Sequence, residues 1–234
     1  MSAEDVGDAA CCITVADEPV VLLPSRALWI PNQQLVCVAD LHWGKAAAFR
    51  AAHVPVPTGG THADLTRLTA ILQHTAASHL VILGDLLHDR SGRHEDTMHR
   101  IASWRAQHAA IHITLVRGNH DRHAGDPPST LNIKCVNAPY RMGPFVGVHE
   151  PETDLEYTPA LDAPGYVLAG HLHPHVTIRG RGRQALRLPA FVVGTQRAVL
   201  PAFSSFTGGG MYTRQPGDAL YGIADEQVIP LTRS

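Results

Sequence analysis

The sequence predicts an α/β chain in which a parallel sheet comes first and mostly antiparallel strands follow. Up to residue 121, apolar runs and helical periods alternate in the order strand, loop, helix, strand, helix, strand, which is typical of parallel strands with crossover helices. After Pro127–Pro128 the apolar runs become short, are joined by turns and show no helical period. Several strands also end in clusters of Asp, Asn and His, at the edge where open α/β sheets place their chemistry.

Composition limits the classes of function. The 234 residues carry a formal net charge of −2 and are 44% hydrophobic, enough for one domain over 1–234 with a full core. A near-neutral charge argues against a basic coat for nucleic acid, although not against nucleic acid held as a substrate. The N-terminus lacks a signal-peptide pattern, no stretch reaches membrane-spanning length, and four cysteines show no paired spacing. We therefore expect a cytoplasmic protein that does not bind a membrane.

The first strands are read from short apolar runs. Residues 1–16 are expected to be a loose lead-in. Val20–Leu23 and Leu28–Ile30 flank a Pro-Ser turn and predict a hairpin. Leu35–Ala39 is apolar throughout, which favours a strand covered on both faces. In the polar cluster that follows, strand alternation would place Asp40 and His42 on one side.

Two longer helices separate the next strands. A short helix or loop is expected over 45–50, and the Pro- and Gly-rich segment 53–60 predicts a loop. Thr61 and Asp64 resemble a capping box for a helix over 62–76, and a second helix over 94–108 should bury Met98, Ile101 and Ala102. The intervening strands are residues 80–83, before Gly84-Asp85, and 111–116, before Gly118-Asn119.

The second half contains seven strand candidates. Two of them end in His149 and in Gly170-His171-Leu172-His173. The segment from Arg179 to Arg183 alternates Arg and Gly, which favours a solvated hairpin tip over a phosphate contact. The candidates are residues 133–136, 145–148, 166–169, 176–179, 190–193, 220–224 and 228–231.

Seven side chains of metal-ligand type follow predicted strands. Carboxylate, imidazole and amide groups suit divalent ions such as Mn, Fe, Zn or Ni, and no thiolate lies among them. Seven ligands are too many for one ion and suit two. Two ions about 3.5–4 Å apart, bridged by a carboxylate, clamp a phosphoryl group and lower the pKa of a bound water. The seven are Asp40, His42, Asp85, Asn119, His149, His171 and His173.

These motifs, in this order, resemble those of the calcineurin-like metallophosphoesterases. They are D-L-H at 40–42, G-D-L-L-H at 84–88, G-N-H-D at 118–121, His149 and G-H-L-H at 170–173. The stretches LLPSRALWIP, ADLHWGKAAAFR, VPVPTGG and LPAFSSFTGG further resemble a bacterial family, the ligase-associated DNA damage response endonucleases. The resemblance implies a four-layer αββα sandwich of two mixed sheets flanked by helices.

The resemblance also assigns roles. Asp40, His42, Asp85 and His173 would hold one metal, while Asp85, Asn119, His149 and His171 would hold the other. Manganese is the expected metal, with iron, zinc or nickel as alternatives. His120 would face the scissile phosphate. Many phosphatases of the class have Asp where this sequence has His88. The G-D-L-L-H form instead resembles that of related double-strand-break repair nucleases, in which a second histidine acts beside the first. This leaves Asp121 and Asp89 as candidates to orient His120.

The expected activity is hydrolysis of a phosphodiester in DNA, by a metal-bound hydroxide that attacks the phosphorus, in bacterial DNA repair. Lys45, Arg50 and Arg90 follow ligand motifs and are candidate phosphate contacts, and Trp43 could stack a base or pack in the core. A DNA ligase and a helicase are the implied partners, and the oligomeric state stays open, a homodimer included. The alternatives are a phosphatase or pyrophosphohydrolase of small molecules and a non-catalytic scaffold.

Overall fold

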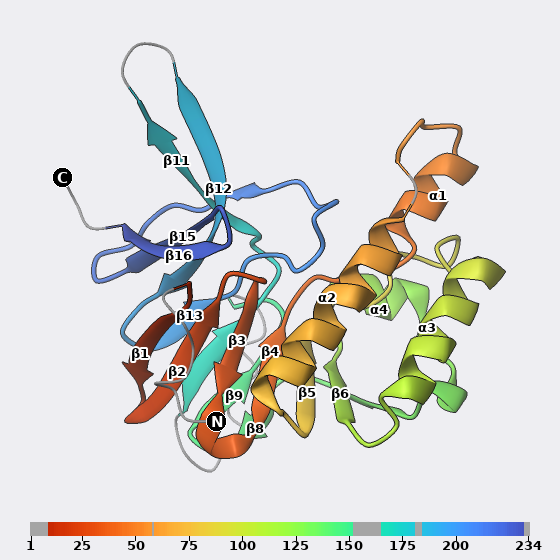
Figure 1. Ribbon diagram of the computed structural model, residues 1–234, viewed down its shortest axis with the longest axis horizontal. Helices are drawn as coiled ribbons and strands as arrows, with labels where there is room; N and C mark the ends of the chain where they lie inside the picture. The colour runs from red at the N-terminus through yellow and green to blue at the C-terminus, as the bar shows by residue number, and fades with distance from the viewer. Residues whose placement is uncertain (1–8, 58, 152–164, 181–183, 232–234) are drawn as a thin grey trace.

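Two mixed β-sheets with flanking helices make up the architecture, as expected (Figure 1). The computed structural model describes residues 9–57, 59–151, 165–180 and 184–231. In both sheets parallel and antiparallel strands occur together, and the polar clusters follow the parallel strands.

The first sheet joins an antiparallel meander to four parallel strands. Apolar side chains bury both faces of its central strands, which is the pattern that the sequence predicted for residues 35–39. Two expectations were wrong. Residues 11–15 pair with the next strand instead of forming a loose lead-in, and residues 133–136 extend the parallel part of this sheet. The strands are β1 (Cys11–Val15), β2 (Glu18–Leu23), β3 (Ala27–Ile30), β4 (Leu35–Val38), β5 (His79–Leu83), β6 (His112–Val116) and β7 (Ile133–Val136).

Four α-helices lie between β4 and β7: α1 (Lys45–Ala51), α2 (Gly60–Thr75), α3 (Glu95–Gln107) and α4 (Asn119–Ala124). Helices α2 and α3 pack on the outer face of the first sheet (Figure 1). The expected capping box at Thr61 is absent, because Gly59 caps α2 and the Thr61 hydroxyl accepts the Gly44 N–H. Ala102 is exposed, and Trp104 takes its place in the core, because the buried stripe of α3 runs through Ile101 and Trp104.

The second sheet contains a parallel core among antiparallel strands. Strands β9, β10 and β13 are parallel, so the expectation of a mostly antiparallel half missed this element. Its parallel pairing matters because His149 and His171 follow the ends of β9 and β10. The strands are β8 (Tyr140–Met142), β9 (Phe145–Gly147), β10 (Tyr166–Ala169), β11 (Pro174–Arg179), β12 (Ala185–Val193), β13 (Arg197–Val199), β14 (Gly210–Met211), β15 (Ala219–Ala224) and β16 (Gln227–Leu231).

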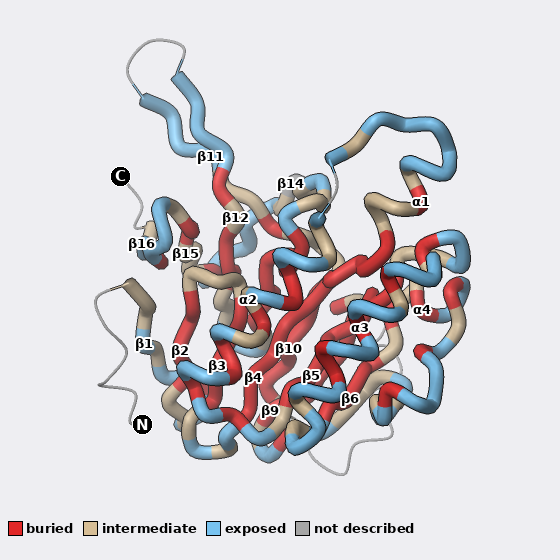
Figure 2. Tube along the Cα trace, turned by 45° about the vertical axis from the view of Figure 1, so that its right-hand side comes forward, coloured by how far each residue is buried: buried red, intermediate tan, exposed pale blue. Residues whose placement is uncertain are grey.

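Two apolar cores lie on either side of the first sheet, one beneath α2 and α3 and the other between the two sheets. Leu28 and Leu83 of the first sheet are buried against Phe145, Leu168 and Phe191 of the second. Each such side chain stabilises the fold by about 1.5–3 kcal/mol when fully buried. Figure 2 shows the buried strands at the centre, with exposed residues at α1 and at the outer part of the β11–β12 hairpin.

Within the described residues, no helix is both long and apolar enough to cross a membrane.

Candidate metal centre

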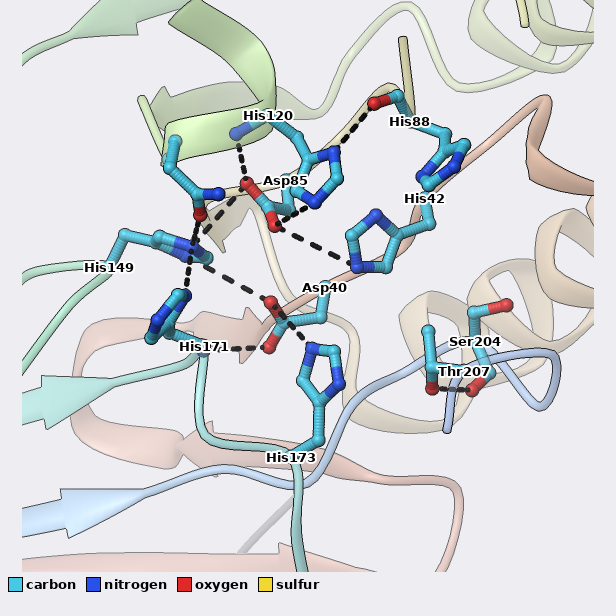
Figure 3. Close-up of polar contacts among 12 residues, drawn as sticks. Asp40, His42, Asp85, His88, His120, His149, His171, His173, Ser204 and Thr207 are labelled. Atoms are coloured by element: carbon cyan, nitrogen blue, oxygen red, sulfur yellow. Dashed lines mark hydrogen bonds and ion pairs between the residues drawn. The ribbon is translucent and has the colours of Figure 1, made fainter. Parts of the chain in front are cut away.

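The predicted ligands come together at one place from both sheets (Figure 3). Asp40 follows β4, Asp85 follows β5, and Asn119 begins α4 directly after β6. His149 follows β9, and His171 and His173 follow β10. The chain folds back between these elements, so groups far apart in the sequence are in contact, as in the hydrogen bond from the His171 N–H to Asp40 Oδ2, 131 residues away, at 3.0 Å.

Left-handed backbone positions aim the ligands into the centre. Asp40, His42, Asp85, His171 and His173 have φ between 44° and 68°, a region that non-glycine residues rarely adopt. Such positions cost about 1 kcal/mol or more each and gather at functional sites. The expectation that strand alternation would direct Asp40 and His42 was therefore wrong, because β4 ends at Val38 and the following backbone turns sharply.

Two glycines are required by close packing at the centre. Gly84 has φ of 81°, and a Cβ there would collide with the His149 ring. A Cβ on Gly118 would collide with the Asp85 carboxylate. These contacts explain why the motifs at 84–88 and 118–121 begin with Gly: a neighbouring ligand occupies the space that a side chain would need.

The centre has a first cluster around Asp40. His173 Nε2 lies 3.1 Å from Asp40 Oδ1, and His42 Nε2 lies 3.7 Å from Asp85 Oδ2. Among the described residues, both ring nitrogens of His42 are buried without a hydrogen-bond partner. Burial lowers the pKa of His42 to about 2, so the ring is neutral and offers a lone pair. An orphaned buried imidazole beside two carboxylates fits a cation site.

The second cluster surrounds His149. Its Nε2 lies 2.9 Å from Asn119 Oδ1, 3.4 Å from Asp85 Oδ1 and 3.2 Å from His171 Nδ1. Its Nδ1 lies 2.9 Å from the Leu83 carbonyl oxygen, which places the ring hydrogen there in the neutral form and leaves Nε2 for the centre. Asp85 therefore presents one oxygen to each cluster.

Electrostatics favour a bound cation. Burial raises the pKa of Asp85 to about 6. Burial also opposes ionisation of Asp40, but the His173 hydrogen bond and the charges of His149, His173 and His42 outweigh it and lower its pKa. Two buried carboxylates in one site repel each other, and a divalent cation removes that cost. The oxygen and imidazole donors fit the expected class of divalent metals.

His120 lies on the solvent side, with 36% of its side chain exposed. Its Nδ1 lies 2.7 Å from the His88 carbonyl oxygen, and its Nε2 lies 3.9 Å from Asp85 Oδ2. The His88 and His120 rings stack with centroids 5.0 Å apart. The group that orients His120 is therefore a backbone carbonyl, in place of the carboxylate of Asp121 or Asp89 that the sequence suggested.

Asp121 has a different position from the one expected. It is buried, and its carboxylate accepts backbone N–H groups of Asp85, Leu86, Leu87 and Gly118 at 2.7–3.4 Å. Four such bonds to one carboxylate fix the loop after β5 to the loop after β6. Asp89 accepts Ser91 and Gly92 donors instead.

The candidate phosphate contacts differ in their placement. Lys45 is half-buried, and burial lowers its pKa while Asp85 and Asp40 act in the opposite direction, so it lies within electrostatic reach of the centre. Arg50 donates to the Pro57 carbonyl, and Arg90 donates to the His123 carbonyl. Trp43 is buried and packs edge-on against Trp104, which gives it a role in the core.

Sequence reasoning missed the support from residues 202–208. The N–H groups of Phe203 and Ser204 donate to the carbonyls of Ala39 and Asp40, and the Gly208 carbonyl lies 3.1 Å from His173 Nδ1. Two arginines hold this segment. Arg26 donates to the Ala202 and Ser204 carbonyls, and Arg67 donates to the Phe203 carbonyl. The only sequence signal for this segment was the stretch LPAFSSF, which contains none of the predicted metal ligands.

Comparisons with known proteins agree with this geometry. The family model for calcineurin-like phosphoesterases matches residues 34–184. The solved nuclease MPE of Pseudomonas putida is 38% identical, with a TM-score of 0.80, covering 95% of this chain and 100% of that chain. The phosphoesterase Yfce of E. coli is 18% identical, with a TM-score of 0.42, covering 83% of this chain and 96% of that one; this distant likeness carries no argument. No curated protein matches the sequence.

Both the family match and the similarity to the nuclease extend over the loops that carry the clustered carboxylates and imidazoles. The chain thus belongs to the calcineurin-like phosphoesterase family, whose members are hydrolases of phosphoester bonds.

Proposed function

We propose that the protein is a two-metal phosphodiesterase that cleaves DNA. The observation that carries this proposal is the position of Asp85, which presents Oδ1 to His149 at 3.4 Å and Oδ2 to His42 at 3.7 Å. A carboxylate with one oxygen toward each of two ligand clusters is suited to bridge two cations. Asp40, His42 and His173 would complete one site; Asn119, His149 and His171 would complete the other.

The cations, when bound, would neutralise the phosphoryl oxygens and supply an activated water. The protein's own side chains would orient the metal ligands and assist the leaving group. Carbonyl partners fix the tautomers of His149 and His173, so that their Nε2 atoms face the centre. His120 is fixed in the same way through Nδ1, which leaves its exposed Nε2 to bind a phosphoryl oxygen or, when protonated, to give a proton to the leaving oxygen.

Two observations favour a phosphodiester over a monoester. The 38% identical relative is a nuclease. His88 also stacks on His120, and the G-D-L-L-H form at 84–88 resembles that of double-strand-break repair nucleases of the same class, in which a second histidine acts beside the first.

The finer assignments rest on the resemblance of the sequence. They are manganese as the metal, action in bacterial DNA repair, and functional association with a DNA ligase and a helicase.

The test compares four substrates with Mn and with Mg: a bis-aryl phosphodiester, an aryl phosphomonoester, single-stranded DNA and double-stranded DNA. We expect metal-dependent cleavage of the diester and of DNA, and loss of both in His120→Ala. An exposed histidine on α3, substituted as His99→Ala, is the matched control and should keep full activity. Hydrolysis of the monoester alone would favour a phosphatase of small molecules, and no hydrolysis with either metal would refute the proposal.

A further inference from the structure

The β11–β12 hairpin extends away from the rest of the fold (Figure 1). Strand β11 begins at Pro174, directly after His173. Residues 190–193 of β12 pair with β13 and β15, whereas residues 185–189 pair only with β11 among the described strands. The outer part of the hairpin is exposed from Thr177 to Gly180 and from Gln184 to Arg187.

The charge of this segment differs from that of the chain. Residues 174–190 contain four arginines and no acidic residue, whereas the whole chain has 19 basic and 21 acidic side chains. Among the described positions, Arg179 and Arg187 are both exposed. A local positive segment in a chain of net negative charge indicates a site for an anionic partner.

Register places these two arginines on one face. Thr177 lies opposite Arg187, and Arg179 lies opposite Ala185. Side chains at i and i+2 of a strand share a face, so Arg179 and Arg187 are diagonal neighbours on it. The opposite face carries the exposed apolar side chains Ile178 and Leu186.

The arginine face is the one that meets the centre. Arg187 donates to the Gly209 carbonyl at 2.5 Å, and the adjacent Gly208 carbonyl lies 3.1 Å from His173 Nδ1. A Cβ on Gly209 would collide with the His175 ring, which shares the face of Thr177. Residues 208–209 therefore contact both the candidate metal ligand His173 and Arg187 of the hairpin.

We infer that this arginine face binds the phosphate backbone of DNA on one side of the scissile phosphate. The inference rests on the proposed function and adds the path that the DNA strand takes beside the scissile phosphate. The six residue steps from His173 to Arg179 span about 20 Å at a strand rise of about 3.3 Å, comparable to about six nucleotides at 3.4 Å each. Arginine is suited to this role because its planar guanidinium binds phosphate through two parallel donors.

The experiment compares the double variant Arg179→Ala/Arg187→Ala with the wild type, on a single-stranded 20-mer and on a small aryl diester. We expect the KM for the 20-mer to rise about tenfold or more relative to that for the small diester, because two phosphate contacts are lost. The slope of log affinity for the 20-mer against log salt should fall by about 1.4, at about 0.7 per contact. The variant Arg179→Lys/Arg187→Lys should recover most of both quantities.

Two variants are matched controls. Leu186→Ala alters the opposite face of the same hairpin, and Arg100→Ala removes an exposed arginine from α3; both should leave the KM ratio and the salt slope unchanged. If the wild type cleaves the 20-mer and the double variant matches it in ratio and slope, the hairpin assignment is wrong while the proposed function stands. If the wild type hydrolyses the small diester but neither binds nor cleaves the 20-mer, both assignments are wrong.

Discussion

The two sheets contribute different chemistry to one centre. Loops after the first sheet supply both carboxylates, Asp40 and Asp85, together with His42 and Asn119. Loops after the second sheet supply imidazoles alone, from His149, His171 and His173. The carboxylates are almost completely buried, with 0% and 3% of their side chains exposed, whereas 18% of the His173 side chain is exposed. The negative charge therefore lies at the floor of the centre, and the His173 imidazole forms part of its rim.

The two groups are also held differently. The loops after β5 and β6 are fixed by a buried carboxylate, Asp121, that accepts backbone N–H groups from both. The rings of His149 and His173 are fixed by carbonyl oxygens of Leu83 and Gly208. The position of Asp85 therefore depends on one side chain, whereas each of these rings depends on the local course of the backbone. Substitutions can separate these two kinds of support.

The largest effect is expected from Asp85→Asn, which removes the charge between the two clusters. We expect a loss of kcat/KM of about 10³-fold, since several kcal/mol of charge stabilisation are lost. Metal content, measured by elemental analysis, should fall below that of the wild type. Two bound metals and normal activity in this variant would exclude a bridging role.

A smaller effect, on stability, is expected from Asp121→Asn. The amide of Asn replaces one carboxylate oxygen by an NH2 group, which places a donor against backbone N–H donors. The free energy of unfolding of the metal-free protein should therefore fall by about 1–3 kcal/mol. Urea denaturation measures it. Asp126→Asn is the matched control, because Asp126 is half-exposed in its ion pair with Arg117 and should change stability by less than about 1 kcal/mol. Equal losses in both variants would contradict the special support by Asp121.

The smallest effect should come from Arg67→Met, which acts through residues 202–208, the segment that contacts both Asp40 and His173. Arg67 holds the Phe203 carbonyl and lies 4.1 Å from the centre of the Phe203 ring, and it pairs with the buried Asp64. Its loss should loosen the segment whose Gly208 carbonyl orients His173.

We expect about tenfold weaker metal binding by calorimetry, with kcat recovered at saturating metal. Arg100→Met on α3 is the control, with unchanged metal affinity. A lowered kcat that excess metal does not restore would assign Arg67 another role.

Much of the site could be predicted from the sequence because each motif directly follows an apolar run. Asp40, Asp85 and Asn119 follow β4, β5 and β6, and parallel strands end at one edge, so their proximity follows from the strand pattern. His149 and His171 were located by the same pattern, although the parallel pairing of β9 with β10 was not foreseen.

The rest depends on contacts that no local pattern encodes. The left-handed backbone at Asp40 and His42 arises from the loop that follows β4, and periodicity does not predict it. The carbonyl that orients His120 belongs to His88, and backbone acceptors leave no trace in residue type. Arg26 and Arg67 bind carbonyls about 136 to 178 positions away, so neither differs in sequence from a surface arginine.

One contact described above has a broader consequence. His149 extends from a loop of the second sheet, yet its ring is anchored on the carbonyl of Leu83, at the end of a strand in the first sheet. Any sliding of one sheet over the other would pull this ring off its anchor. Catalytic activity therefore depends on the alignment of the two sheets. Substitutions that repack Phe145 or Leu168, deep in the interior, should change that activity although neither residue lies near the substrate.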